Sequence, residues 1–165
     1  MDNVNEKVIH KELSYKITGL LFKTHKELGK YRNEKQYSDY FEELLKQGKI
    51  DYIREHRFED NQCGKGNARC ICDFVIEDKI ILEFKTKDFI SKENYYQAKR
   101  YLVTLNLKLA IIVNFRQPRL SPKRVLNGQY YDNPNLHNPN LHNPNLRIIS
   151  EPANSYKSND NSDKT

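Results

Sequence analysis

The chain has 165 residues, enough for one globular domain and some further sequence outside it. Apolar residues make up 37% of it and charged residues 30%, as in a compact globular protein, and no apolar run approaches roughly 18 residues, so we expect no membrane-spanning helix. The first residues are charged and contain no continuous apolar stretch, so we expect no secretory signal and a cytoplasmic location.

The positive charge is concentrated in the N-terminal part of the chain. Residues 1–126 carry 25 lysines and arginines against 18 acidic residues, whereas residues 127–165 carry 3 against 4. A basic domain suits a polyanionic partner such as nucleic acid, but charge alone is weak support because many basic domains bind none.

Two helices open the predicted domain. Apolar residues recur at helical spacing from Leu13 to Leu28, and Gly29 suits the left-handed position that ends many helices. A second periodic segment runs from Asn33 to Gln47 and ends at Gly48.

Strands make up most of the segment that follows. Ile50–Phe58 indicates a first strand, and Cys70–Ile76 and Lys79–Lys85 are rich in β-branched and aromatic residues. Ser91–Leu105 predicts a helix whose first residue, a serine, is a candidate N-cap. Leu109–Phe115 is almost continuously apolar, which is typical of a strand covered on both faces.

The composition changes after Arg124. Residues 133–147 read NPNLH-NPNLH-NPNLR, and a proline at every fifth position excludes a regular helix or strand. One leucine per unit is too little core for a solenoid. We therefore predict a folded domain at 1–126, a low-complexity repeat segment at 127–150, and a disordered tail at 151–165, where apolar residues are almost absent.

The three cysteines are Cys63, Cys70 and Cys72. An odd number without a secretory signal favours free thiols in a reducing compartment. A metal site is the alternative, although the spacing C-x6-C-x-C matches no established zinc pattern.

The residues with the clearest chemical potential are Asp73-x9-Glu83-x-Lys85, which lie across the two strongest strands. Acidic side chains in apolar strands are unfavourable unless they are paired or bound to a metal. If the strands are joined by three residues, Ile76 faces Ile80 and Asp73 faces Glu83, and directly opposed side chains point to the same face.

This register separates the side chains of the two strands by character. One face would carry only apolar side chains, those of Cys72, Phe74, Ile76, Ile80, Leu82 and Phe84. The other would carry Asp73, Val75, Ile81, Glu83 and Lys85. Two facing carboxylates repel unless a cation lies between them, and Mg²⁺ prefers such oxygen ligands, while the lysine could activate water or neutralise a phosphate. An internal ion pair on a half-solvated sheet remains the structural alternative.

The segment from Leu13 to about Arg124 resembles the GxxExxY proteins, which are placed in the PD-(D/E)XK nuclease superfamily. The matching stretches, in chain order, are ITGLLFKTHKELG (17–29), Glu34-x-x-Tyr37, CDFVIEDKIILEFK (72–85), YYQAKRYL (95–102) and KLAIIVNF (108–115). The family's naming glycine aligns with Tyr31, so the motif here reads Tyr31-x-x-Glu34-x-x-Tyr37. The NPNLH repeats lie outside the resemblance.

The resemblance implies an α/β (α+β) fold with a restriction-endonuclease-like core, in which helices flank a central mixed four-stranded sheet. It also implies that Asp73 and Glu83 ligate a metal ion, with the backbone carbonyl of Phe84 as a possible further ligand. Lys85 would be the catalytic lysine.

Two helical residues would complete the site that the resemblance implies. Glu34 would reach toward it and help to bind or orient the metal, and Gln97 would face it near the phosphate or the attacking water. The alternatives are an ordinary surface charge for Glu34 and a polar helix position without a role for Gln97. A histidine on the first helix, His25, is more readily explained by hydrogen-bonded packing than by metal binding.

A cluster of basic residues follows the last predicted strand and could bind a phosphate backbone, with a solvated surface as the alternative. Its members are Arg116, Arg119, Lys123 and Arg124. The resulting hypothesis is a Mg²⁺- or Mn²⁺-dependent endonuclease that hydrolyses DNA by in-line attack of a metal-activated water. The alternative is a catalytically silent module that binds nucleic acid or protein on the same fold. The preference for DNA over RNA comes from the resemblance alone.

Overall fold

The computed structural model describes residues 8–59 and 69–129, so Cys63, the repeats and the C-terminal tail lie outside the described residues. The elements in chain order are α1 (Lys11–Leu28), α2 (Glu34–Gln47), β1 (Tyr52–Glu59), β2 (Arg69–Ile76), β3 (Ile80–Lys85), α3 (Lys92–Thr104), β4 (Leu109–Asn114) and β5 (Lys123–Leu126). Every predicted helix and strand is present, and their ends agree with the prediction to within two residues. None of the helices in these two ranges is both long and apolar enough to cross a membrane.

The strands form one mixed sheet in the order β1-β2-β3-β4-β5. β3 and β4 are parallel and are connected through α3, whereas the other neighbouring strands are antiparallel. The predicted mixed sheet flanked by helices is confirmed, but the expected number of four strands is wrong. The fifth strand has only four residues and follows Ser121 and Pro122, too short and polar a stretch for the residue pattern to reveal.

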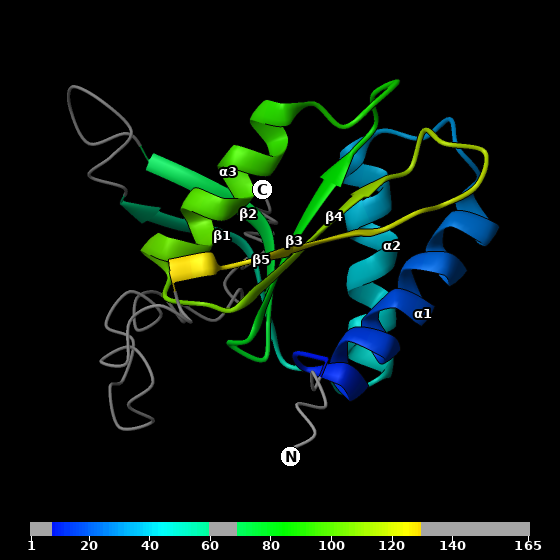
Figure 1. Cartoon of the computed structure of the whole chain (residues 1–165). Helices are drawn as coiled ribbons and strands as arrows, with labels where there is room; N and C mark the ends of the chain where they lie inside the picture. The colour runs from blue at the N-terminus through cyan, green and yellow to red at the C-terminus, as the bar shows by residue number, and fades with distance from the viewer. Residues whose placement is uncertain (1–7, 60–68, 130–165) are drawn as a thin grey trace, which may run out of the picture.

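The helices cover both faces of this sheet, so the molecule has three layers. Figure 1 shows α1 and α2 on one side of the strands and α3 on the other. Successive residues of β3 point to opposite faces. Ile80, Leu82 and Phe84 pack with α1 and α2, whereas Ile81 packs with α3. All six residues of β4 are buried, as expected for a strand covered on both faces.

The connection between α1 and α2 is held by Tyr37. Its buried ring stacks on Phe115 with 4.1 Å between ring centroids, and its hydroxyl donates to the carbonyl of Gly29 at 2.7 Å. Gly29 ends α1 with φ 69° and ψ −158°. The expectation of a left-handed αL cap is therefore wrong in ψ, although the positive φ in this extended region is one that essentially only glycine adopts.

The hairpin between β2 and β3 has the predicted register. Ile76 pairs with Ile80 and Phe74 with Leu82, and residues 77–79 form the three-residue connection. Glu77 and Asp78 both have positive φ, a backbone conformation that matches the twist of two antiparallel strands.

One residue of this hairpin lies on the opposite face from the one expected. Cys72 packs with the α3 side of the sheet, whereas Phe74 packs with the α1 and α2 side. Regular alternation would place both on one face, so the alternation breaks at Asp73. The break coincides with an unusual backbone on the neighbouring strand: the pairs Arg54–Phe74 and His56–Cys72 place Glu55 across from Asp73, and Glu55 has φ 50°.

Candidate active site

Three charged side chains gather near the C-terminal end of β3. The Lys85 Nζ lies 2.9 Å from Oε2 of Glu83, and the two side chains are only 13% and 4% exposed. Asp73, from the neighbouring strand β2, accepts a hydrogen bond from the backbone N–H of Phe84 at 2.5 Å. The break in alternation thus aims the Asp73 carboxylate at the β3 backbone between Glu83 and Lys85.

Burial dominates the electrostatics of this group. It raises the pKa of Glu83 to about 7, and the Asp73 charge adds to this shift while Lys85 opposes it. Burial also raises the pKa of Asp73, although the Phe84 N–H and Lys85 oppose the increase. For Lys85, burial lowers the pKa, but the contact with Glu83 and the charges of Asp73 and Glu34 together outweigh it, and the net shift is upward. With both acids ionised, the two carboxylates of Asp73 and Glu83 outnumber the one positive charge of Lys85, so the group can accept a further cation.

One oxygen of this site lacks a hydrogen-bond donor. Within the described part of the chain, Oε1 of Glu83 is buried and has no hydrogen-bond partner. A buried acceptor without a donor is unfavourable, and a cation would satisfy it. No three His, Cys, Asp or Glu side chains among residues 8–59 and 69–129 form a complete ligand set. Mg²⁺ nevertheless fits Asp73 and Glu83, because it is commonly held by one or two carboxylates, with water and phosphate as its other ligands.

Glu34, the first residue of α2, lies beside this group. Its Oε1 is 3.4 Å from the Thr86 hydroxyl, and its charge raises the pKa of Asp73. A second acid with the same electrostatic effect is Glu55, the residue opposite Asp73 on β1. Sequence reasoning missed Glu55 because its position depends on strand pairing and on an unusual backbone conformation that the residue pattern does not show.

Gln97 reaches the site only indirectly. Its Nε2 donates to the hydroxyl of Tyr101 at 2.7 Å, one turn further along α3. Tyr101 is 3% exposed, and burial, opposed by this hydrogen bond and reinforced by the Glu83 charge, raises its pKa to about 12. Tyr101 was also missed, although its four-residue spacing from Gln97 was a usable signal.

The predicted basic cluster does not lie on one surface. Arg116 is closest to the site, since its Nε lies 3.4 Å from the Thr86 carbonyl oxygen. Arg119 is exposed on the connection between β4 and β5. Lys123 and Arg124 are neighbours on β5, so their side chains leave opposite faces of the sheet, and Arg124 donates to the carbonyl of Ile9.

His25 packs rather than facing the site. Its Nε2 lies 2.9 Å from the Gln117 carbonyl, and its ring stacks against Phe115. The packing role expected for this histidine is confirmed.

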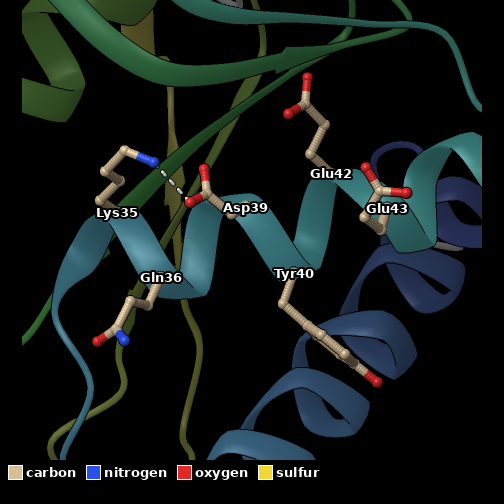
Figure 2. A pocket seen from close by; sticks show the side chains of 6 residues that line it. All are labelled: Lys35, Gln36, Asp39, Tyr40, Glu42 and Glu43. Atoms are coloured by element: carbon tan, nitrogen blue, oxygen red, sulfur yellow. Dashed lines mark hydrogen bonds and ion pairs between the residues drawn. The ribbon is translucent and has the colours of Figure 1, made fainter.

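A surface hollow of about 570 Å³ lies elsewhere, along the outer side of α2. It is lined by Lys35, Gln36, Asp39, Tyr40, Glu42 and Glu43. Figure 2 shows the ion pair between Lys35 and Asp39 at its wall and Tyr40 extending toward α1. Asp39 and Glu42 also bind Arg54 of β1, both at 2.7 Å, so these acids tie the helix to the sheet.

A comparison with known proteins finds a matching family model. Residues 11–125 match the family model described as the PD-(D/E)XK nuclease superfamily. No curated protein matches the chain. A solved structure described as "Crystal structure of SSO0001" is similar over 67% of this chain, with 18% identity and a TM-score of 0.42. The match spans 65% of that protein's chain.

Proposed function

Because this chain belongs to the PD-(D/E)XK nuclease superfamily, we propose that it is a Mg²⁺- or Mn²⁺-dependent endonuclease of the GxxExxY type that hydrolyses DNA phosphodiester bonds. The observation that carries the proposal is the buried Glu83 carboxylate, which contacts Lys85 through one oxygen and lacks a hydrogen-bond donor at the other. A solely structural ion pair would be expected to satisfy both oxygens, whereas a metal ligand keeps one available.

Asp73 and Glu83 would hold the metal ion, with the carbonyl of Phe84 as a further oxygen. The ion would supply a nucleophilic hydroxide and positive charge for the phosphate. Glu34, which lies within electrostatic reach of Asp73 and Lys85, would add negative charge that favours cation binding.

Lys85 would act on the phosphate directly. Its raised pKa keeps the amine protonated at neutral pH, so it can donate hydrogen bonds to the charge that develops on the phosphate oxygens. Because the Lys85 amine also contacts Glu83, its position is fixed before substrate arrives. Gln97 would orient the site through Tyr101, and Arg116 would bind a neighbouring phosphate of the strand, with Arg119, Lys123 and Arg124 contributing charge more remotely.

The test is cleavage of plasmid and single-stranded DNA by the full chain with Mg²⁺ or Mn²⁺. We expect Lys85→Ala to lower the rate by about 10²–10³-fold, the loss typical of one stabilising donor, and Asp73→Ala to abolish metal-dependent cleavage. Cleavage of RNA of the same sequence, measured in parallel, shows whether the chain prefers DNA or RNA.

Lys35→Ala is the matched control, because Lys35 is an exposed lysine on α2 whose ion-pair partner within residues 8–59 and 69–129 is Asp39. It should cleave at the wild-type rate. Equal cleavage by all variants would identify a contaminating nuclease, and DNA binding without any cleavage would make the chain a binding module instead.

A further inference from the structure

The segment that links Lys85 to α3 is held in place by side chains of the segment that follows β4. The carbonyl of Thr86 accepts from Arg116, that of Lys87 from Asn114 at 2.6 Å, and that of Asp88 from Gln117 at 2.5 Å. Three consecutive carbonyls are therefore bound by side chains of residues 114–117. This fixes the backbone immediately after the site.

Phe89 projects into solvent from this fixed segment. It is 70% exposed, whereas five of the seven phenylalanines are no more than 7% exposed. The next residue, Ile90, packs against the α3-side core, and the Ser91–Asn94 capping box then starts α3. Anchors on both sides of Phe89 leave its ring exposed but hold its backbone still. A ring that is ordered before binding loses little conformational freedom when a flat partner stacks on it.

The surroundings of Phe89 favour a polyanionic partner. Four residues of extended chain span at most about 14 Å, so the ring lies within a few nucleotides of a phosphate bound at Lys85. Lys87 and Lys92, both exposed, lie two residues before and three residues after Phe89, and Arg116 binds the base of the segment. Asp88 is the one acid within the segment, and Glu93 follows Lys92 on α3.

We infer that Phe89 is a stacking platform for an unpaired nucleobase next to the scissile phosphate, so that the preferred substrate is single-stranded or locally unpaired nucleic acid. The inference rests on the proposed function for its substrate class. Every base offers a face to an aromatic ring, whereas in an intact duplex both faces of an internal base are already stacked on its neighbours. Phe89 would thus favour unpaired over base-paired strands and would not distinguish one base sequence from another.

The experiment measures binding by fluorescence anisotropy in EDTA, so that no cleavage occurs. The full-length wild type, Phe89→Ala and Phe89→Trp are titrated with oligothymidylate, oligouridylate, and an abasic oligonucleotide of equal length and phosphate number. Phe22→Ala is the matched control, because Phe22 is an exposed phenylalanine on α1. Thermal unfolding of each variant checks that it folds, which is expected because Phe89 is 70% exposed.

For Phe89→Ala we expect a rise in Kd of roughly 5- to 150-fold for at least one of the two base-containing strands, as loss of one stacked base predicts. Binding of the abasic strand should not change, and Phe89→Trp and Phe22→Ala should bind like the wild type. Unchanged binding of both base-containing strands by Phe89→Ala, or an equal loss on the abasic strand, overturns the inference.

The two proposals fail separately. Base-dependent binding through Phe89 without metal-dependent cleavage would end the nuclease proposal and leave the platform in place. Cleavage that depends on Lys85, together with binding that is unchanged in Phe89→Ala, would support the nuclease proposal and end the stacking-platform proposal.

Discussion

Replacing Glu83 with glutamine should make the stability of this protein depend differently on pH. The folded state raises the pKa of Glu83 from its ordinary value of 4.5 to about 7, first because the side chain is buried and also because Asp73 lies nearby. Glutamine has nearly the same shape but stays neutral, so it imitates the protonated acid at every pH.

The direction and size of this pH dependence of stability follow from the linkage between protonation and folding. A raised pKa means that the folded protein holds this proton more tightly than the unfolded chain does. The stabilisation is therefore complete below pH 4.5 and is lost as the pH rises through 7. This rise in the pKa from 4.5 to about 7 corresponds to about 3 kcal/mol in the free energy of unfolding. Since Glu83 is almost fully buried, solvent screening reduces this little.

The assay is urea denaturation of the wild type and Glu83→Gln in EDTA, from pH 4 to pH 8. We expect the variant to become more stable relative to the wild type by about 3 kcal/mol across this range. Asp73 and Lys85 are present in both proteins but respond to the Glu83 charge, so the comparison reports the titration of Glu83 together with its effect on these two neighbours. Glu43→Gln, at an exposed glutamate on α2, should show no such trend. A difference between wild type and Glu83→Gln that stays constant with pH would refute the reasoning.

Three further predictions concern the fold, each measured as the free energy of unfolding. Tyr37→Phe removes the hydroxyl that binds Gly29 and Arg32 and should destabilise the protein by about 0.5–1.5 kcal/mol; no change would mean that water replaces it fully. Gly29→Ala places a side chain at φ 69° and ψ −158° and should cost about 1–3 kcal/mol, whereas a neutral effect would contradict the backbone described. A chain ending at residue 129 keeps buried Asn127 and should match the full chain to within about 0.5 kcal/mol, unless residues 130–165 contribute to the core.

Most of the fold could be predicted because the relevant signals are local. The hydrophobic period identified each long element, and the three-residue connection after Ile76 fixed the register that sets Phe74 against Leu82. The proximity of Glu83 and Lys85 follows from two-residue spacing on one strand.

What the residue pattern could not supply depends on contacts distant in sequence. The face taken by Cys72 depends on the backbone of Glu55 across the strand pair, and the fifth strand forms only because β4 offers a free edge. The link from Gln97 to the site through Tyr101 also required the packing of α3 on the sheet. Charge composition alone likewise could not show that Lys123 and Arg124 leave opposite faces.

The positive φ at Glu55 also bears on whether another chain can add to the edge of the sheet. β1 is the outermost strand on one side of the described sheet, and an outer strand offers unpaired amides on which another chain can build. A turn of the backbone at its middle divides eight residues into two short runs, neither long enough to template a growing aggregate. We therefore expect the positive φ at Glu55 to limit the addition of another chain along β1.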